Sequence, residues 1–366
     1  MLFESAGNSQ ADAVDGEGAS RSEPCGGRGL RPADPGLVVV DKPRGITSRA
    51  AVDRVVRLVG RRTRVGHAGT LDPLASGVLV ILVGAATRLV EEVQRMPKTY
   101  RTVVRLGARS DTLDADGLIE LVPDPHRPEP SAIDRAVAPL MGEVEQVPPR
   151  FSALKVGGRR AYDLARAGRS VDLAPRRVRI DRIEVIRYEW PELELEIDCG
   201  AGTYIRSIAR DVGEALGCGG LVDVLVRTRI GPFRIDDAVG LSRLTAESLP
   251  GLLRPPVEAV AGLPRRVLEA DELAAVASGR RLPARDVAEV GGRVALVDLD
   301  GRLVALGEVE SPGGWIQPRK VLLAAEARPA PGRAGEPSAA PNSGPAIRVE
   351  EMPQVSANLP WAGSGE

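Results

Sequence analysis

The chain has 366 residues, of which 43% are hydrophobic, 27% charged and only 3% aromatic, and its formal net charge is −1. This length gives room for two domains with buried cores, which must consist mainly of aliphatic side chains. A strongly basic protein is excluded, and so are a disulfide framework and a multi-histidine metal centre, because Cys25, Cys199 and Cys218 are scattered and His67 and His126 are the only histidines.

Both ends of the chain differ in composition from the middle. Residues 1–35 and 329–366 are rich in Gly, Ser, Pro and acids and lack a periodic apolar pattern, which predicts disorder. The part between them carries 44 basic and 40 acidic residues, a mild excess that is compatible with a polyanionic partner. No signal peptide is evident, and the longest apolar run, at 77–86, is too short to span a bilayer. We expect a cytoplasmic protein without membrane contact.

The first half of the middle part predicts a mixture of short strands and helices. Apolar runs predict strands at 37–43, 78–84 and 98–108. Helical spacing predicts a helix at 47–60, with Thr47 or Ser48 as N-cap and Gly60 just past its end, and further helices at 86–96, 131–142 and 161–168.

The second half continues with strands at 178–190 and 193–200, turned at Pro191, a helix at 203–217 capped by Thr203, and a strand at 221–233. Because strands and helices do not alternate regularly, the pattern predicts an α+β fold with a mixed, mainly antiparallel central sheet flanked by helices. Beyond a sparse stretch near 256–264, a helix at 269–279 and a hairpin at 293–310 turned at Asp300-Gly301 predict a small β-rich appendage. The expected domains are thus 36–255 and 256–328, between a disordered extension at 1–35 and a disordered tail at 329–366.

The loop at 66–77, GHAGTLDPLASG, holds a single carboxylate, Asp72, among small residues and turn formers. An aspartate before proline is commonly an Asx-turn or a cap. A Walker phosphate loop would need Gly-Lys-Ser/Thr where this loop has Thr-Leu-Asp, and a metal would need neighbouring ligands that are absent. The remaining chemical hypothesis is a nucleophile or general base that requires fixed geometry and no cofactor.

Four sequence blocks, at 66–88, 98–117, 147–168 and 202–217, resemble motifs of the TruB family of tRNA pseudouridine synthases and occur in the family's order. The likeness extends from about residue 37 to 235, and LDPLASG resembles the bacterial stand-alone branch rather than the guide-RNA-dependent branch. It implies the pseudouridine synthase fold, with a C-terminal domain that resembles a PUA domain only loosely. It also implies a monomer that isomerises uridine 55 in the T-loop of tRNA without cofactor or protein partner.

The resemblance implies roles for three residues. Asp72 matches the nucleophile, which attacks either C1′ of the sugar or C6 of the base. Arg206 matches the arginine that pairs with it, and such a partner would oppose the loss of charge that burial under an RNA base favours. Tyr100 matches the tyrosine that stacks on the target base and is a candidate for removing the C5 proton. Without the motifs, Arg206 would be expected as an exposed helix residue and Tyr100 as half-buried packing.

The remaining candidates concern RNA binding, because the target base must be flipped out of the T-loop. His67 matches the histidine implicated in that step, and Asp114 could form hydrogen bonds in the same region. Tyr204 and Leu225 are expected to line the pocket. Lys155, Arg159 and Arg160 lie in the region that embraces the RNA in the family, and are expected to contact phosphates.

Each of these candidates also has a structural alternative, as a satisfied histidine, a solvated acidic turn, core packing or a solvated charged face. Phe151 stands where relatives often have Tyr, so a hydrogen bond from that hydroxyl is in doubt here. Two other functions remain open, an RNA-binding or RNA-folding module and a guide-RNA-dependent subunit.

Overall fold

The structure is a computed structural model that describes residues 35–152, 155–156, 159–160, 173–285, 292–310 and 314–323. For 155–156 and 159–160 it describes the backbone only. Residues 1–34 and 324–366, the predicted helix at 161–168 and the side chains of Lys155, Arg159 and Arg160 lie outside the described residues.

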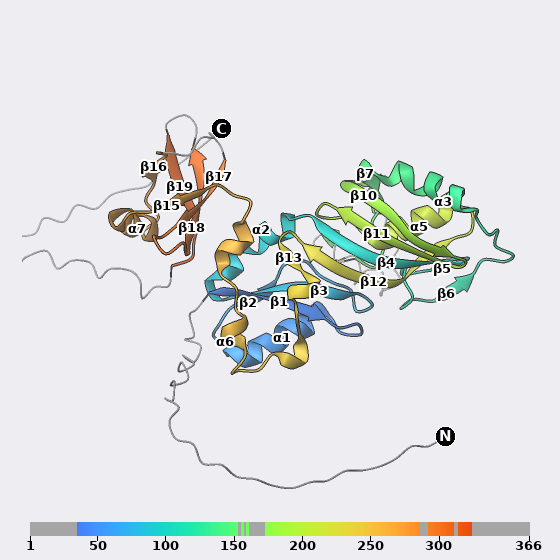
Figure 1. The fold of residues 1–366 in the computed structure, drawn as a ribbon, viewed down its shortest axis with the longest axis horizontal. Coiled ribbons are helices and arrows are strands. Elements are labelled where there is room, and N and C mark those ends of the chain that lie inside the picture. Colours follow the sequence, from blue (N-terminus) through green and yellow to red (C-terminus); the bar gives the residue numbers. More distant parts are fainter. Residues whose placement is uncertain are drawn as a thin grey trace, which may run out of the picture. The chain divides into compact units, whose positions relative to one another are not determined.

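In the described part of the chain, the larger sheet has ten strands, and its main path is β14-β1-β3-β12-β4-β11-β10-β7, with β2 beside β3 and β13 beside β12 (Figure 1). Among the described strands of this sheet, only β1/β14 and β3/β12 pair in parallel, which confirms the mixed, mainly antiparallel sheet. The strands are β1 (Gly36–Lys42), β2 (Val65–His67), β3 (Ser76–Val83), β4 (Lys98–Leu106), β7 (Gly142–Gln146), β10 (Arg176–Glu189), β11 (Glu192–Cys199), β12 (Gly220–Ile230), β13 (Phe233–Arg234) and β14 (Val239–Gly240).

The helices of the described part are α1 (Ser48–Val59), α2 (Val90–Arg95), α3 (Pro130–Val137), α5 (Ile205–Ala215), α6 (Leu249–Leu252) and α7 (Ala270–Ala277). All of them but α7, which belongs to the second sheet described below, pack against this sheet or lie between its strands and the second sheet. Turns of 3-10 helix occupy Gly84–Leu89, Ala138–Leu140, Ile235–Asp237, Leu241–Arg243 and Pro256–Val260. Two small hairpins complete this part, β5 (Ala108–Ser110) with β6 (Ile119–Leu121) and β8 (Lys155–Val156) with β9 (Arg159–Arg160).

The core explains the long apolar runs of the sequence. Strand β3 is buried along most of its length. Helix α1 packs on one of its faces, and the 3-10 turn Gly84–Leu89 and α2 pack near the other. A strand that is covered on both faces carries a continuous rather than an alternating apolar pattern. Helices α3 and α5 cover β4, β10, β11 and β12 in a second part of the core. The predicted active-site loop joins β2 to β3 and therefore lies at the end of the most buried strand.

A second sheet has the order β15-β17-β18-β19-β16. Its strands are β15 (Arg265–Val267), β16 (Leu282–Pro283), β17 (Arg293–Val297), β18 (Leu303–Glu310) and β19 (Trp315–Val321). The predicted hairpin is β17 and β18, and α7 is the predicted helix beside them. Both sheets belong to one compact unit of the chain. The domain boundary at 255/256 stays a prediction.

Several predicted elements have different bounds in the structure. The helix predicted at 86–96 is a 3-10 turn followed by the short α2, and the helix predicted at 131–142 ends as α helix at Val137. The strand predicted at 221–233 stops at Ile230, because Gly231 adopts φ +50° and turns the chain into β13. Thr47 caps α1, as one of the two predicted residues, by accepting a hydrogen bond from the Ala50 amide at 3.1 Å.

The prediction that Thr203 caps α5 is wrong. Helix α5 begins at Ile205, and the Thr203 hydroxyl instead donates to the carbonyl oxygen of Gly200. The side chain of Gln146, from β7, takes over part of that role: its amide oxygen accepts from the Tyr204 amide at 2.8 Å and its amide nitrogen donates to the Tyr204 carbonyl at 3.1 Å. A residue that is distant in sequence therefore fixes the start of the helix.

Candidate active site

The loop that holds Asp72 is fixed at its centre and at its C-terminal end. At its centre, the Ser48 hydroxyl accepts a hydrogen bond from the Leu71 amide at 2.8 Å and donates to the Leu71 carbonyl at 3.0 Å. At its end, Gly77 has φ +98° and packs so tightly that a Cβ there would lie 2.3 Å from the Arg227 carbonyl oxygen. These contacts restrict the positions that Asp72 can adopt.

Asp72 pairs with Arg206, which is the second residue of α5. One terminal nitrogen of the Arg206 guanidinium, Nη2, lies 2.8 Å from Asp72 Oδ2, and the other, Nη1, lies 3.1 Å from Asp114 Oδ2. It also donates to the carbonyls of Thr112 and Phe151, both at 2.9 Å. The Arg206 side chain is 6% exposed and that of Asp72 is 40% exposed. A buried guanidinium, with partners on both terminal nitrogens, thus binds a half-exposed carboxylate.

A pocket of about 390 Å³ opens beside this ion pair. Five of the predicted site residues line it together, namely Asp72, Tyr100, Tyr204, Arg206 and Leu225. They come from the loop, β4, the N-terminus of α5 and β12. The sheet brings them together because Arg227 on β12 is paired with Tyr100 on β4, and Leu225 is paired with Thr102 on β4.

Tyr100 is buried at the pocket wall. Burial raises the pKa of its phenol above the usual value, and the nearby Arg227 guanidinium opposes that shift. The phenol is therefore protonated near neutral pH. The role of Tyr100 in removing the C5 proton stays a prediction.

Three buried cations close to the loop are absent from the sequence predictions. Lys98 and Arg227 line the pocket, whereas Lys42 is buried outside its lining, within the electrostatic reach of Asp72. Burial is the main cause that lowers the pKa of Lys42 and of Lys98 to about 8, and Asp72 opposes the shift of Lys42. In the sequence they stand out only as charged residues within apolar strands.

Two predicted RNA contacts lie outside the pocket lining. His67, on β2, is half-buried, and burial lowers the pKa of its imidazole. Asp114 is buried beneath Arg206, where it accepts hydrogen bonds from Thr112 Oγ1 at 2.6 Å and from the Asp116 amide. Burial raises the pKa of Asp114, and Arg206 and these bonds oppose the shift. Its position suits holding Arg206 better than touching RNA.

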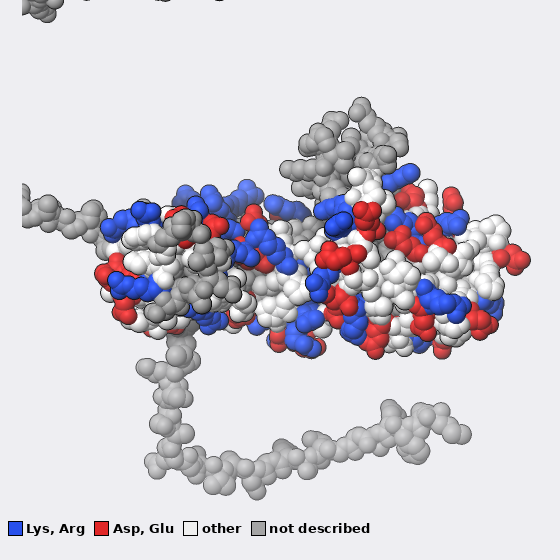
Figure 2. All heavy atoms as spheres, turned by 90° about the horizontal axis from the view of Figure 1, so that it is seen from above, with Lys and Arg blue, Asp and Glu red and all other residues white. Residues whose placement is uncertain are grey.

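Surface charges are extensively paired. On the face drawn in Figure 2, Lys and Arg are interspersed with Asp and Glu. Strand β11 contributes Glu192, Glu194, Glu196 and Asp198 to ion pairs with arginines of β4, β10 and β12, namely Arg101, Arg182, Arg187 and Arg229. Because these arginines form ion pairs on the surface of the sheet, the arginine content of the chain does not by itself indicate RNA binding.

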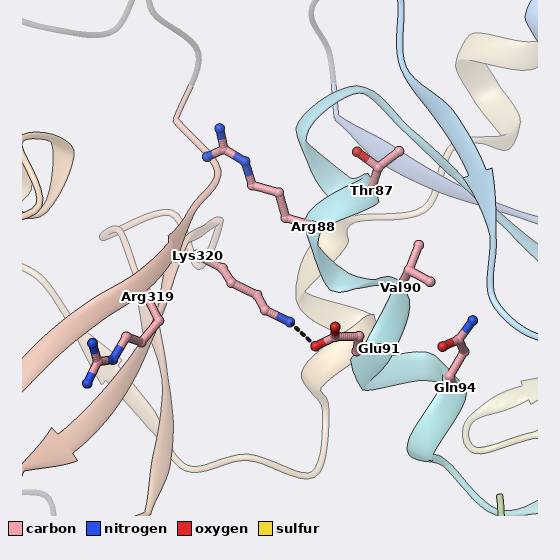
Figure 3. A pocket seen from close by; sticks show the side chains of 7 residues that line it. All are labelled: Thr87, Arg88, Val90, Glu91, Gln94, Arg319 and Lys320. Carbon is pink, nitrogen blue, oxygen red and sulfur yellow. Dashed lines mark hydrogen bonds and ion pairs between the residues drawn. The ribbon is translucent and has the colours of Figure 1, made fainter. Parts of the chain in front are cut away.

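A second hollow, of about 530 Å³, lies between α2 and β19. Figure 3 shows Lys320 reaching from β19 toward Glu91 on α2, with Nζ 3.1 Å from Oε2. Its lining contains none of the residues that the sequence singled out. Within the described ranges, no three His, Cys, Asp or Glu side chains form a group that could hold a metal, and no helix is long and apolar enough to cross a membrane.

Comparison with protein families gives two adjacent matches. The model of the TruB family pseudouridylate synthase N-terminal domain matches residues 57–205. The model of the tRNA pseudouridylate synthase B C-terminal domain matches residues 206–258. The first match contains Asp72 and Tyr100, and the second begins at Arg206.

Curated relatives and solved structures agree with these matches. A tRNA pseudouridine synthase B of Mycobacterium tuberculosis is 48% identical over 278 residues, which cover 74% of this chain and 91% of the relative. Its namesake in Aromatoleum aromaticum is 42% identical over 292 residues, covering 78% and 92%. A chain in the crystal structure of a Cbf5-Nop10-Gar1 complex has a TM-score of 0.63 and 27% identity, and the match covers 81% of this chain and 87% of that one. These findings confirm the predicted fold class, and the five-stranded sheet is consistent with a PUA-like domain.

Proposed function

The chain belongs to the TruB family of pseudouridylate synthases, and we propose that it isomerises uridine 55 in the T-loop of tRNA to pseudouridine. The observation that carries this proposal is the pairing of a half-exposed Asp72 with a buried Arg206 beside a pocket that has room for one flipped-out nucleotide. The reaction is an isomerisation, so it needs no net oxidant or reductant.

In the proposed mechanism, Asp72 is the nucleophile. Arg206 binds its carboxylate and holds it beside the pocket that the base enters. The N1–C1′ bond breaks, the base turns, and a C5–C1′ bond forms. The C5 proton then leaves and N1 gains a proton, so the product has the same atoms as the substrate.

The pocket walls position the base. Tyr100 offers a ring for stacking, and Tyr204 and Leu225 are proposed to contact the base from the same pocket lining. His67 is proposed to act in the flipping step, and Lys155, Arg159 and Arg160 to contact phosphates. We further propose that the protein acts as a monomer and without a guide RNA, because it is more similar to tRNA pseudouridine synthase B than to the Cbf5 structure.

The test uses the full chain and an unmodified tRNA transcript carrying [5-³H]uridine, so that tritium release measures loss of the C5 proton. We expect turnover of this transcript, no turnover when position 55 is cytidine, and no turnover by Asp72→Asn, which keeps its affinity for tRNA. Normal turnover by Asp72→Asn would contradict the proposal. An inactive wild type on the naked transcript would instead indicate a guide-RNA-dependent enzyme.

An RNA-folding role would be separate from this chemistry. It predicts that Asp72→Asn still accelerates the refolding of a misfolded tRNA, which aminoacylation of the refolded RNA can measure. Refolding that requires an intact Asp72 would contradict such a role.

A further inference from the structure

Two of the cations in the active-site pocket are buried without a carboxylate partner. The side chain of Lys98 donates to the carbonyls of Gln94 and Met96, and that of Arg227 donates to the carbonyls of Val78 and Gly69. Lys98 is 6% exposed and Arg227 is 1% exposed. Among the described residues, neither takes part in an ion pair. Burying an unpaired charge is costly, and carbonyls alone compensate it only in part.

Both cations lie on the pocket face of the sheet. Lys98 and Tyr100 are two positions apart on β4, so their side chains lie on the same face, and Arg227 is the cross-strand partner of Tyr100. All three line the pocket that Asp72 borders. The pocket therefore has two kinds of positive charge. Arg206 is paired with two carboxylates, whereas Lys98 and Arg227 are paired with none among the described residues.

The proposed reaction moves a negative charge into this part of the pocket. If Asp72 attacks C1′, the carboxylate becomes an ester and the N1–C1′ electron pair leaves with the base, which becomes an anion. If Asp72 attacks C6, the carboxylate again becomes an ester and the electron pair of the C5–C6 double bond moves toward O4. By either route, one negative charge passes from Asp72 to the uracil ring, and it returns when the C5–C1′ bond has formed and the C5 proton has left.

We propose that Lys98 and Arg227 stabilise the negative charge that the uracil ring carries between cleavage of the glycosidic bond and formation of the carbon–carbon bond. The inference rests on the proposed function and assigns two further catalytic residues to the same site. Cations that are fixed before the reaction, in a pocket without water, stabilise developing charge far better than cations in solution. Their lack of carboxylate partners leaves that charge available to the substrate.

A purely structural role is the alternative, since Arg227 joins Gly69 to Val78 and Lys98 binds the carbonyls at the end of α2. The distinguishing experiment changes the substrate rather than only the protein. Fluorine at C5 withdraws electrons and stabilises an anionic base by itself. A variant that has lost charge stabilisation should therefore be less impaired on 5-fluorouridine than on uridine, whereas a distorted loop should impair both equally.

The measurement is the single-turnover rate at which the nucleoside at position 55 is consumed, for tRNA with uridine or 5-fluorouridine there, by nuclease digestion and chromatography of the nucleosides. Because 5-fluorouridine has no C5 proton to lose after the C5–C1′ bond has formed, loss of the starting nucleoside, and not formation of pseudouridine, is compared for the two substrates. We expect Lys98→Met to slow uridine about 100-fold and 5-fluorouridine about tenfold or less. Arg227→Gln, which can still donate to carbonyls, should show the same dependence on substrate, and Arg227→Lys, which keeps the charge, should be less impaired than Arg227→Gln on uridine. Circular dichroism establishes that each variant is folded.

Lys42 supplies the matched control, because it is equally buried and bonded to two carbonyls, of Pro43 and Ile46, but does not line the pocket. Lys42→Met should slow both substrates by the same factor. An equal factor on both substrates for Lys98→Met would overturn the proposal while leaving the proposed function intact. A wild type that converts neither substrate would overturn the proposed function itself.

The pH dependence gives a second readout. Lys98 faces Arg227 from β12, the Cys199 thiol from β11 and the carbonyls at the end of α2. The pKa of Lys98 is about 8, whereas burial raises that of the Cys199 thiol to about 11, so Lys98 changes charge first as pH rises. Its ammonium is present below pH 8 and lost above, so the wild-type rate should fall as pH rises through about 8. Lys98→Arg should keep its rate to higher pH. If the pH at which the rate falls is shifted in Lys42→Arg but not in Lys98→Arg, then Lys98 does not supply the charge.

Discussion

Arg206 connects two carboxylates that differ in exposure, and this makes its geometry as important as its charge. Its two terminal nitrogens bind Asp72 and Asp114 and the carbonyls of Thr112 and Phe151. Lysine carries the same charge but offers no planar fork that can bridge these partners. We therefore expect Arg206→Lys to lose about 100-fold or more in single-turnover rate, with little change in tRNA affinity measured by filter binding.

Arg210 offers the control for this substitution, because it lies one turn further along α5 and donates to Val147 and Asp211 outside the pocket. Arg210→Lys should leave the rate close to that of the wild type. Equal losses in the two variants would mean that the helix, and not the fork at Arg206, was being disturbed.

The sequence predicts the residues of the site unevenly. Asp72 stands out by itself, as the one carboxylate in a loop of small residues, but the link to Arg206 and Tyr100 came only from the family resemblance. Lys98 and Arg227 were missed because a charged residue in a strand is usually solvent-facing, and the partners that bury them come from other strands. The signal that could have found Arg227 is its place two residues after Leu225, on the same strand face.

At the scale of elements, the active-site loop depends on a contact with α1. Ser48 is buried and forms both of its hydrogen bonds with the backbone of Leu71, the residue before Asp72. Ser48→Ala would leave a buried amide and a buried carbonyl without that partner. We expect it to lower the free energy of unfolding by about 2 kcal/mol, measured by urea denaturation, and to reduce the single-turnover rate. A stability loss without a loss of rate would show that this contact does not position Asp72.

Gly77 fixes the C-terminal end of the same loop. Its φ of +98° disfavours any other residue, and the added Cβ would collide with the Arg227 backbone. Gly77→Ala should therefore destabilise the fold by more than about 3 kcal/mol, since both strain and a clash with backbone atoms must be relieved. Gly217→Ala is the control, because Gly217 has φ +69° but nothing within 4 Å of an added Cβ, and it should cost about 1 kcal/mol. Similar urea midpoints for the two variants would contradict the clash.

Elements were predictable where local pattern decides and less so where tertiary contacts do. The continuous apolar runs of β1 and β3 and the N-cap of α1 are local features, and the structure confirms them. The start of α5 is set by Gln146, which precedes the helix by almost sixty residues, so no local signal could replace Thr203 as the expected cap. The short β2 was missed because its three residues pair only with β3.

At the scale of the whole chain, the two sheets share a core and a buried charge. Leu89 and Val93, in the segment that ends in α2, belong to one apolar cluster with residues of β17 and β18. Glu92, beside them, is bound by Lys320 at 3.2 Å and Arg95 at 3.5 Å and also by Arg293. Arg293 and Lys320 are more than 200 positions away, which is why the sequence predicted the appendage but not how it is attached.

Glu92 therefore tests whether this contact stabilises the chain as a unit. Its side chain is 6% exposed, whereas that of its neighbour Glu91 is 63% exposed, although both bind Lys320. Glu92→Gln keeps the shape but removes the charge that three cations share. We expect a loss of about 2 kcal/mol in urea unfolding, which is less than for a fully buried pair because the three cations are partly solvated. Glu91→Gln should leave the midpoint where it is, because water already screens that carboxylate. If the two variants unfold alike, the attachment rests on the apolar cluster alone, and Leu89→Ala should then cost more than either.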